Sequence, residues 1–195
     1  MIYVIDDFYP NPDLIRNAAL KLKYNDGYFG GKLNYASSRA LNPWANNRVY
    51  LFNKWQTQVQ RPILNFTLKA NGSFNLGYSE KHKNSWIHQD NTIKGEEGQM
   101  WAAVIYLTPN PPENSGTCFF KNEQGQLKGN GKGPPYKGNV LDSESEWKPH
   151  LQVENVYNRC ILYHGDLYHA PTVSYFGNSK QSGRLTQVGF FYAEI

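Results

Sequence analysis

The sequence of 195 residues has little of the features that mark several specialised protein classes. Its two cysteines, Cys118 and Cys160, are too few for a disulfide scaffold or a four-cysteine zinc site. No apolar run approaches the roughly 18 residues of a membrane span. A basic segment followed by a long apolar one, which would predict a signal peptide, is also missing at the start. We therefore expect a cytoplasmic protein with reduced thiols and no membrane partner.

The chain also lacks a large excess of charge of one sign. Twenty basic and sixteen acidic residues give a formal net charge of +4, and they are scattered along the chain. A polyanionic partner is permitted but not indicated, so there is no clear nucleic-acid signal. The 39% of hydrophobic residues argues against wholesale disorder, and the 15% of aromatic residues favours β structure.

The two longer helical patterns lie in the first third of the chain. Asn11 is a suitable N-cap and Pro12 a suitable first residue for a helix that runs to about residue 23. A second helix is expected over about residues 47–60, ended by Pro62. Its expected apolar face has the i, i+3, i+4 spacing and consists of Val49, Phe52, Trp55 and Val59.

Strand patterns follow the helical patterns. The apolar run 100–107 predicts a central strand buried on both faces, and residues 184–192 predict the last strand. Residues 143–150 are predicted to form a turn of helix. The glycine-rich stretch 121–136 predicts a surface loop that closes over the functional site as a lid. We expect one mainly β domain over residues 1–195, with a helical flank to about residue 70 and a jelly-roll core beyond it.

The residues with the most distinctive chemistry lie at the end of a predicted strand, in the run Ser-Trp-Ile-His-Gln-Asp at 85–90. Side chains alternate along a strand, so His88 and Asp90 point to one side and Gln89 to the other. An imidazole and a carboxylate aimed at one point supply two ligands of a 2-His-1-carboxylate iron site. The same triplet also fits a polar strand end with a surface histidine and a turn-forming aspartate.

A third ligand has to come from a distant strand, and three histidines follow Asp90 in the sequence. His150 lies in the charged segment that is predicted to be helical. His164 follows the tyrosine that ends one predicted strand, whereas His169 precedes Ala-Pro at the start of the next. We prefer His169 as the ligand and interpret His164 as a turn residue or a neighbour that orients a ligand.

The predicted last strand carries an arginine that faces inward. Arg184 and Thr186 share a face with three apolar side chains, since residues two apart point to the same side. A buried guanidinium needs an anion, and its fork suits a carboxylate. A neighbouring hydroxyl would add one hydrogen bond to that carboxylate. The alternative is an arginine paired with an aspartate or glutamate of the protein itself.

Together these pieces resemble the 2-oxoglutarate/Fe(II)-dependent oxygenases, and more closely their prolyl 4-hydroxylase-like branch. The family pattern is HxD, a distal histidine, and an arginine followed two residues on by serine or threonine. His88 with Asp90, then His169, then Arg184 with Thr186 match this pattern in order. The gap before the arginine is a few residues longer than usual, which predicts an enlarged hairpin between the last two strands.

The resemblance implies both a fold and an activity. The fold would be a double-stranded β-helix (a cupin-like jelly roll) with N-terminal helices. The two histidines and the aspartate would bind Fe(II), and Arg184 with Thr186 would hold the far carboxylate of 2-oxoglutarate. Tyr106 would add a phenol hydrogen bond to this co-substrate, although it also fits a core tyrosine. With O2, such an enzyme would hydroxylate a protein side chain or a small molecule and release succinate and CO2.

Two other functions stay open on the sequence. A non-catalytic jelly-roll module would keep the fold and bind without turnover. A cupin-type dioxygenase would use iron but not 2-oxoglutarate. Conversion of 2-oxoglutarate to succinate in the presence of Fe(II) separates the three functions. The sequence does not indicate the substrate or the oligomeric state.

Overall fold

The computed structural model describes residues 1–26, 37–66, 71–79, 82, 86–90, 97–129, 136–137 and 147–195. In chain order, its elements are β1 (Ile2–Ile5), α1 (Pro12–Leu20), β2 (Ser38–Ala40), α2 (Ala45–Val59), β3 (Ile63–Asn65), β4 (Ser73–Gly77), β5 (Trp86–Ile87), β6 (Gln99–Tyr106), β7 (Thr117–Lys121), β8 (Tyr136–Lys137), β9 (Lys148–Val153), β10 (Cys160–His164), β11 (His169–Pro171) and β12 (Arg184–Ala193).

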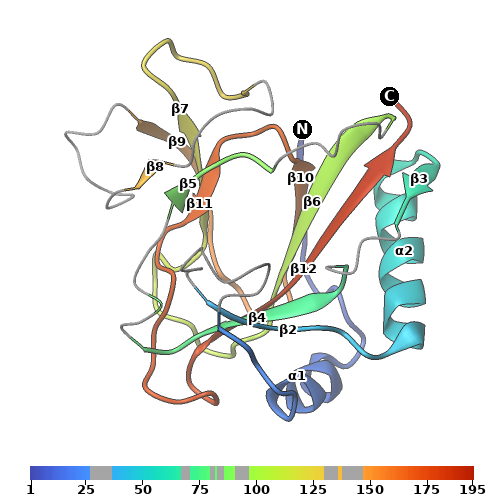
Figure 1. The fold of residues 1–195 in the computed structure, drawn as a ribbon, viewed down its shortest axis with the longest axis vertical. Helices are drawn as coiled ribbons and strands as arrows, with labels where there is room; N and C mark the ends of the chain where they lie inside the picture. The colour runs from blue at the N-terminus through green and yellow to red at the C-terminus, as the bar shows by residue number, and fades with distance from the viewer. Residues whose placement is uncertain are drawn as a thin grey trace.

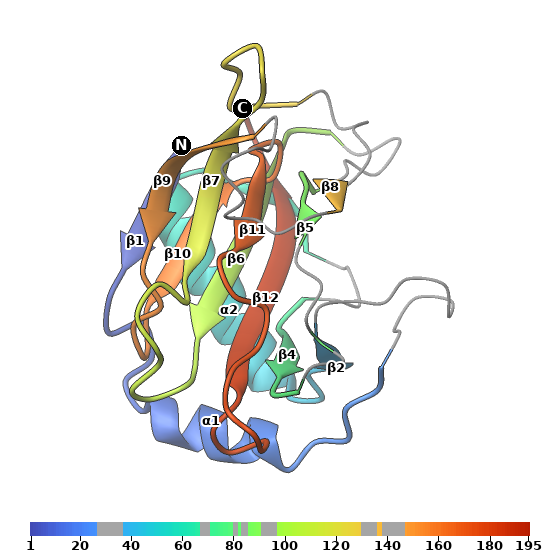
Figure 2. The same cartoon turned by 90° about the vertical axis from the view of Figure 1, so that its left-hand side faces the viewer.

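The strands form two sheets that face each other (Figure 1). The large sheet has the order β1-β10-β6-β12-β4-β2, with β3 also paired to β12, and the small sheet has the order β11-β7-β9. A bridge between His88 and His169 joins the end of β5 to β11, and β5 pairs in turn with β8. Figure 2 shows the small sheet in front of the large one. The predicted mainly β jelly roll with flanking helices is confirmed.

The predicted central strand, β6, and the predicted last strand, β12, lie side by side in the middle of the large sheet. β6 is hydrogen-bonded to β10 on one side and to β12 on the other. The two faces of β6 are covered as well, one by α2 and the other by the small sheet (Figures 1 and 2). This burial explains why residues 100–107 are apolar at nearly every position rather than at alternate ones.

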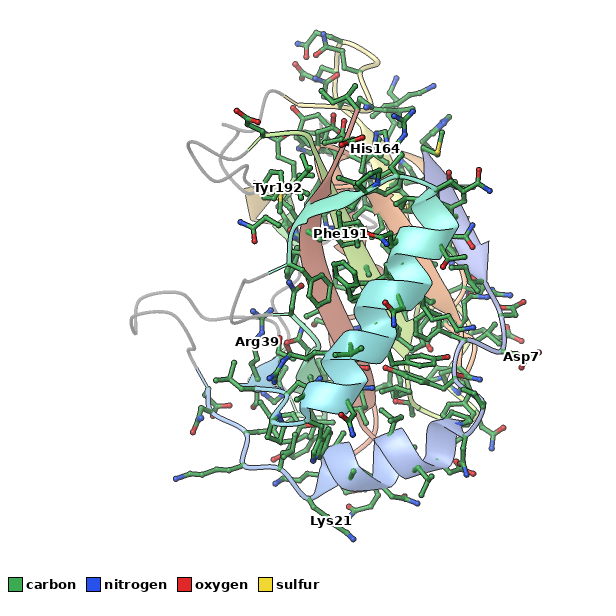
Figure 3. The ribbon with its side chains drawn as sticks, turned by 90° about the vertical axis from the view of Figure 1, so that its right-hand side faces the viewer. Asp7, Lys21, Arg39, His164, Phe191 and Tyr192 are labelled. Carbon is green, nitrogen blue, oxygen red and sulfur yellow. The ribbon has the colours of Figure 1, made fainter. Side chains whose placement is uncertain are left out.

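Helix α2 packs against the face of the large sheet that is turned away from the small sheet (Figure 3). The predicted apolar face of this helix is only partly right, because Val49 is 58% exposed. The buried residues instead follow one another at intervals of four and are Asn47, Leu51, Trp55 and Val59. A buried asparagine interrupts the apolar pattern, which is why hydrophobicity alone misplaced the face.

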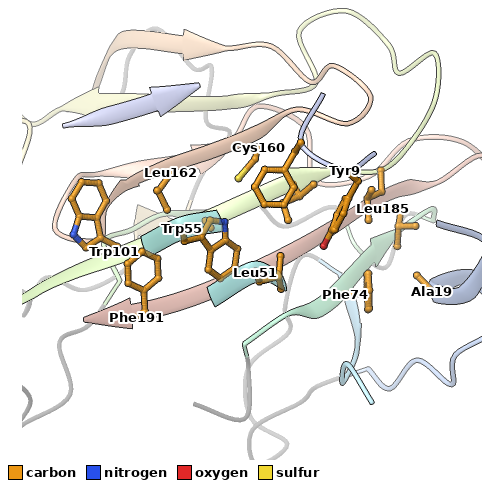
Figure 4. Close-up of a cluster of buried hydrophobic side chains, with 14 of the residues drawn as sticks. Tyr9, Ala19, Leu51, Trp55, Phe74, Trp101, Cys160, Leu162, Leu185 and Phe191 are labelled. Carbon is orange, nitrogen blue, oxygen red and sulfur yellow. The ribbon is translucent and has the colours of Figure 1, made fainter. Parts of the chain in front are cut away.

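The main hydrophobic core lies between α2 and the large sheet (Figure 4). Trp55 of α2 stacks on Phe191 of β12, with ring centroids 5.7 Å apart. Gly189, two residues earlier, gives the indole room, because a methyl group there would overlap the Trp55 ring. Cys118 and Cys160 are both buried and form no disulfide. No helix in the described ranges is long and apolar enough to cross a membrane.

Two sequence predictions are wrong. Residues 148–150 belong to β9 and not to a helix, because pairing with β7 outweighs the local charge pattern. Between β11 and β12 there is no hairpin, because β11 pairs with β7 whereas β12 pairs with β3, β4 and β6. This connection therefore crosses from the small sheet to the large one. The predicted lid falls partly on residues 130–135, which lie outside the described residues.

Candidate metal centre

Three side chains converge between the two sheets. The ligand atoms of His88, Asp90 and His169 all lie within 4.8 Å of one another. The His169 Nε2 atom is 3.7 Å from Asp90 Oδ2, and the two imidazole centroids are 4.4 Å apart. The structure thus brings together the three residues that the sequence singled out as ligands.

Backbone hydrogen bonds position this cluster. The N–H of His88 donates to the carbonyl of His169 at 3.0 Å, and the N–H of His169 donates back to His88 at 2.8 Å. The N–H of Asp90 donates to the carbonyl of Gly165 at 2.8 Å, in the turn between β10 and β11. The amide of Gln89, on the other side of the chain, lies against the backbone of Gly129. The alternation expected of a strand end therefore holds here.

The protonation state of His169 suits a divalent cation. His169 Nδ1 lies 2.8 Å from the carbonyl oxygen of Leu167, so this nitrogen carries the proton and Nε2 keeps its lone pair. Burial, together with the charge of His88, lowers the pKa of His169 well below its ordinary value, so the ring is neutral. Neutral imidazole nitrogen is the form that binds a metal.

Asp90 shows the same preference for a cation. Burial raises the pKa of Asp90 to about 6, although the charges of His88 and Arg39 act in the opposite direction. Its Oδ2 atom is buried and has no hydrogen-bond partner. A buried carboxylate oxygen without a partner is costly, and a bound cation would remove that cost. Two imidazoles and one carboxylate are also the donor set typical of non-haem Fe(II).

Arg184 is buried on the inner face of β12, and no described residue forms a salt bridge with it. Its Nε atom is 3.5 Å from the carbonyl oxygen of Ser115, and its guanidinium carbon is 5.8 Å from the centre of the Tyr106 ring. Burial lowers the pKa of Arg184. Among the described residues, the alternative of an arginine paired with an acidic side chain is therefore not observed.

Thr186, on the same strand as Arg184, and Tyr106, on the adjacent strand β6, are neighbours of Arg184. They are directly opposite each other in the pairing of β6 with β12, so their side chains share a face. The Tyr106 hydroxyl lies 2.7 Å from Thr117 Oγ1 on the small sheet. Burial raises the pKa of Tyr106 to about 12, so the group is a neutral phenol that can donate a hydrogen bond.

No family model and no curated protein matches the sequence. Solved structures do match. HygX from Streptomyces hygroscopicus with nickel, 2-oxoglutarate and hygromycin B bound has a TM-score of 0.65 at 14% identity, over 98% of this chain and 82% of that one. A Pseudomonas putida prolyl-4-hydroxylase has a TM-score of 0.53 at 14% identity, over 100% and 93%. A Trichoplax adhaerens prolyl hydroxylase in complex with a peptide fragment of hypoxia inducible factor has a TM-score of 0.56 at 11% identity, over 99% of this chain and 83% of that one.

The chain has the fold of the 2-oxoglutarate/Fe(II)-dependent oxygenases. In this oxygenase fold the two remaining histidine candidates lie away from the cluster. His150 is exposed on β9. The His164 ring packs edge-on against Trp101, with centroids 4.3 Å apart, and its carbonyl accepts the N–H of Leu167 in the turn. Burial and nearby positive charges lower the pKa of His164 to about 4.

Three residues that the sequence did not single out also face the inside of this oxygenase fold. The Tyr163 ring lies 4.8 Å from the His169 ring, and burial raises the pKa of its phenol well above the ordinary value. Asn75 is directly opposite Thr186, and Arg39 is directly opposite Asn75. Asn75 alternates with the apolar residues Phe74 and Leu76, a pattern typical of a strand with one solvated face. Only the strand pairing reveals that this face is turned toward the small sheet.

Proposed function

We propose that this protein is a 2-oxoglutarate- and Fe(II)-dependent dioxygenase that hydroxylates a small molecule or a protein side chain and releases succinate and CO2. One observation carries the proposal. A buried guanidinium without an acidic partner among the described residues accompanies a 2-His-1-carboxylate cluster between the same two sheets. The carboxylate and imidazoles of the cluster would be stabilised by a bound cation, and the buried guanidinium by a bound anion.

His88, Asp90 and His169 would hold the metal. Bound Fe(II) with 2-oxoglutarate supplies the oxidative chemistry that no protein side chain can perform. The carbonyl of Leu167 keeps the proton on Nδ1 of His169, so that Nε2 remains the ligating atom. The rings of Phe119 and Tyr163 lie 6.3 Å and 4.8 Å from the His169 ring, and both side chains are almost fully buried. They would help to exclude water from this side of a bound metal.

Arg184 would bind the far carboxylate of 2-oxoglutarate through its planar fork. Thr186 is buried two residues along the same strand and would donate one further hydrogen bond. The phenol of Tyr106 would be a third donor, held in place by Thr117. All of these donors are neutral or positive, as recognition of a carboxylate requires.

The same residues argue against the two alternatives. A binding module that performs no turnover does not need a cluster with a set tautomer and a buried, unneutralised carboxylate oxygen. A cupin-type dioxygenase that does not use 2-oxoglutarate has no use for a buried arginine that faces no acid among the described residues. Arg184 is thus the residue that favours an enzyme using 2-oxoglutarate over one that does not.

His169→Ala tests the metal site, with His150→Ala as the matched control on exposed β9. Loss of one of three ligands should weaken Mn(II) or Fe(II) binding by more than the roughly 10- to 100-fold caused by loss of an outer partner. Calorimetric titration of both variants measures this loss. Undiminished metal affinity in His169→Ala would refute the assignment.

Turnover then separates the three functions in the wild-type protein. Succinate should form from 2-oxoglutarate in the presence of Fe(II) and O2. Metal binding without consumption of 2-oxoglutarate or O2 would favour the binding module. Uptake of O2 that is independent of 2-oxoglutarate would favour the cupin-type dioxygenase.

A further inference from the structure

The phenol of Tyr163 differs from those of the other buried tyrosines in the described ranges. The hydroxyl of a buried tyrosine usually finds a hydrogen-bond partner, because leaving it without one costs free energy. The other buried tyrosines each direct the hydroxyl to a side-chain partner, and they are Tyr9, Tyr106 and Tyr192. Tyr163 is only 2% exposed, yet its hydroxyl makes no hydrogen bond to any described residue. This donor is therefore available to a bound molecule.

Ring contacts place this phenol beside the candidate metal centre. Tyr163 lies on β10 and packs between the sheets against Phe119 of the small sheet, with ring centroids 5.1 Å apart. The His169 ring is 4.8 Å from the Tyr163 ring. His169 and Phe119 are themselves directly paired in the small sheet. The Tyr163 side chain thus extends from the large sheet toward one of the three candidate metal ligands.

Strand pairing shows that Tyr163 and Tyr106 lie at different levels of the large sheet. Tyr163 is directly opposite Ala102 on β6, and Tyr106 is four residues further along that strand. At about 3.3 Å per residue, this separates the two levels by roughly 13 Å. The Tyr106 ring is 5.8 Å from the guanidinium carbon of Arg184. Tyr106 therefore belongs to the Arg184 end of the expected co-substrate site, and Tyr163 belongs to the metal end.

Electrostatics agrees with this placement of the hydroxyl. Burial, together with the charge of Asp90, raises the pKa of the Tyr163 phenol well above its ordinary value, whereas the charge of Arg184 acts in the opposite direction. The hydroxyl is thus within electrostatic reach of both groups, and it keeps its proton. A neutral phenol of this kind can donate a hydrogen bond to an oxygen atom of a ligand.

We propose that the Tyr163 hydroxyl donates a hydrogen bond to the keto-acid end of 2-oxoglutarate, beside the metal. The inference rests on the proposed function and adds a co-substrate-binding residue at the end opposite Arg184. The keto-acid end brings carboxylate and keto oxygens, and a hydrogen bond to a charged oxygen is among the stronger ones. Each end of the co-substrate then has a phenol donor, Tyr106 at the far carboxylate and Tyr163 at the keto acid.

Tyr163→Phe tests this hydrogen bond, because phenylalanine keeps the ring against His169 and removes only the hydroxyl. Two affinities are measured on Mn(II)-loaded protein without turnover. Calorimetry gives that for 2-oxoglutarate, and paramagnetic relaxation of the methyl protons gives that for pyruvate, a 2-oxo acid without the far carboxylate. Both should fall about tenfold or more, the usual effect of losing a hydrogen bond to a charged group. The melting temperature without ligand should be unchanged or higher, because no partner among the described residues loses a hydrogen bond.

Two further variants serve as controls. Arg184→Leu should lose affinity for 2-oxoglutarate but not for pyruvate, because it acts on the far carboxylate alone. Tyr50→Phe is the matched control for the loss of a phenol hydroxyl. Tyr50 lies on α2, and its hydroxyl donates to the carbonyl of Phe8 at 2.6 Å. This variant should have a lower melting temperature and wild-type affinity for both ligands. Mn(II) affinity should be unchanged in all three variants.

The outcomes separate this inference from the proposed function. Wild-type protein that fails to bind Mn(II) or 2-oxoglutarate refutes the proposed function and the inference with it. Wild-type binding of 2-oxoglutarate that Tyr163→Phe retains in full overturns the inference alone. A loss confined to 2-oxoglutarate, or no pyruvate binding to the wild type, also overturns it, because the hydroxyl would then not act at the keto-acid end. Weakened Mn(II) binding in Tyr163→Phe would instead make the residue a support of His169, which is likewise a refutation.

Discussion

Arg184→Leu is expected to separate co-substrate affinity from protein stability. Removing one member of a buried ion pair usually costs 3–5 kcal/mol, because the other charge is left buried. No described residue forms an ion pair with Arg184, and the one side-chain hydrogen bond that it makes within the described residues is the 3.5 Å contact to the Ser115 carbonyl. The leucine variant leaves no carboxylate behind and removes a desolvated cation. Its free energy of unfolding without ligand should therefore be unchanged or slightly higher.

The affinity of Arg184→Leu for 2-oxoglutarate should fall sharply at the same time. A charge-assisted, two-point contact in a sheltered site contributes about 2–4 kcal/mol, which corresponds to a loss of about 30- to 1,000-fold. Calorimetry on the Mn(II)-loaded protein measures this affinity, and urea unfolding of the metal-free protein measures stability.

Arg159→Leu provides the matched control for this experiment. Arg159 forms a two-point salt bridge with Asp6, at 2.6 Å and 3.0 Å, on a partly exposed surface. Losing an exposed pair of this kind costs about 0–1 kcal/mol and should leave 2-oxoglutarate affinity unchanged. Unchanged affinity in Arg184→Leu together with a stability loss of several kcal/mol would refute the assignment. Arg184 would then be a structural residue.

Two further predictions concern the ligand Asp90 and the core. The folded-state pKa of Asp90, raised from 3.8 to about 6, disfavours its ionised form. Metal-free protein should therefore be most stable below about pH 4 with respect to this group, and should lose up to about 3 kcal/mol as the pH rises above 6, measured by urea unfolding. A flat profile would contradict this. Gly189→Ala should cost about 1–3 kcal/mol by overpacking against Trp55, and equal melting temperatures would contradict it.

Much of the fold could be predicted from the sequence because its strands carry strong local patterns. The run 100–107 is apolar throughout, and only a strand covered on both faces requires that. Residues 148–150 have no such pattern, since they form an exposed edge strand that is defined by pairing with β7. The connection between β11 and β12 was misjudged for a related reason. Whether two consecutive strands pair with each other is decided by the sheets to which they belong.

The residues of the candidate site also fall into two groups, those that local sequence patterns indicate and those whose position only strand pairing reveals. His88, Asp90 and His169 have distinctive chemistry and lie at predicted strand ends, so local rules are enough to suggest that they meet. Arg39 lies on a three-residue strand without any period. Asn75 reads from sequence as the solvated side of its strand. Their inward orientation depends on the register of β2 with β4 and on that of β4 with β12, and the second joins residues more than a hundred positions apart.

The register of β12 connects the core to the site. A shift of one residue would turn Arg184 and Thr186 toward α2, because alternate side chains of a strand point to opposite faces. Gln187 opposes such a shift from the other face. Its Nε2 donates to Asn47 Oδ1 at 2.8 Å, and its Oε1 accepts the hydroxyl of Tyr9. These buried polar groups satisfy one another only in this register. The hydrogen bonds on the helix side of β12 thus determine which residues face the candidate metal centre.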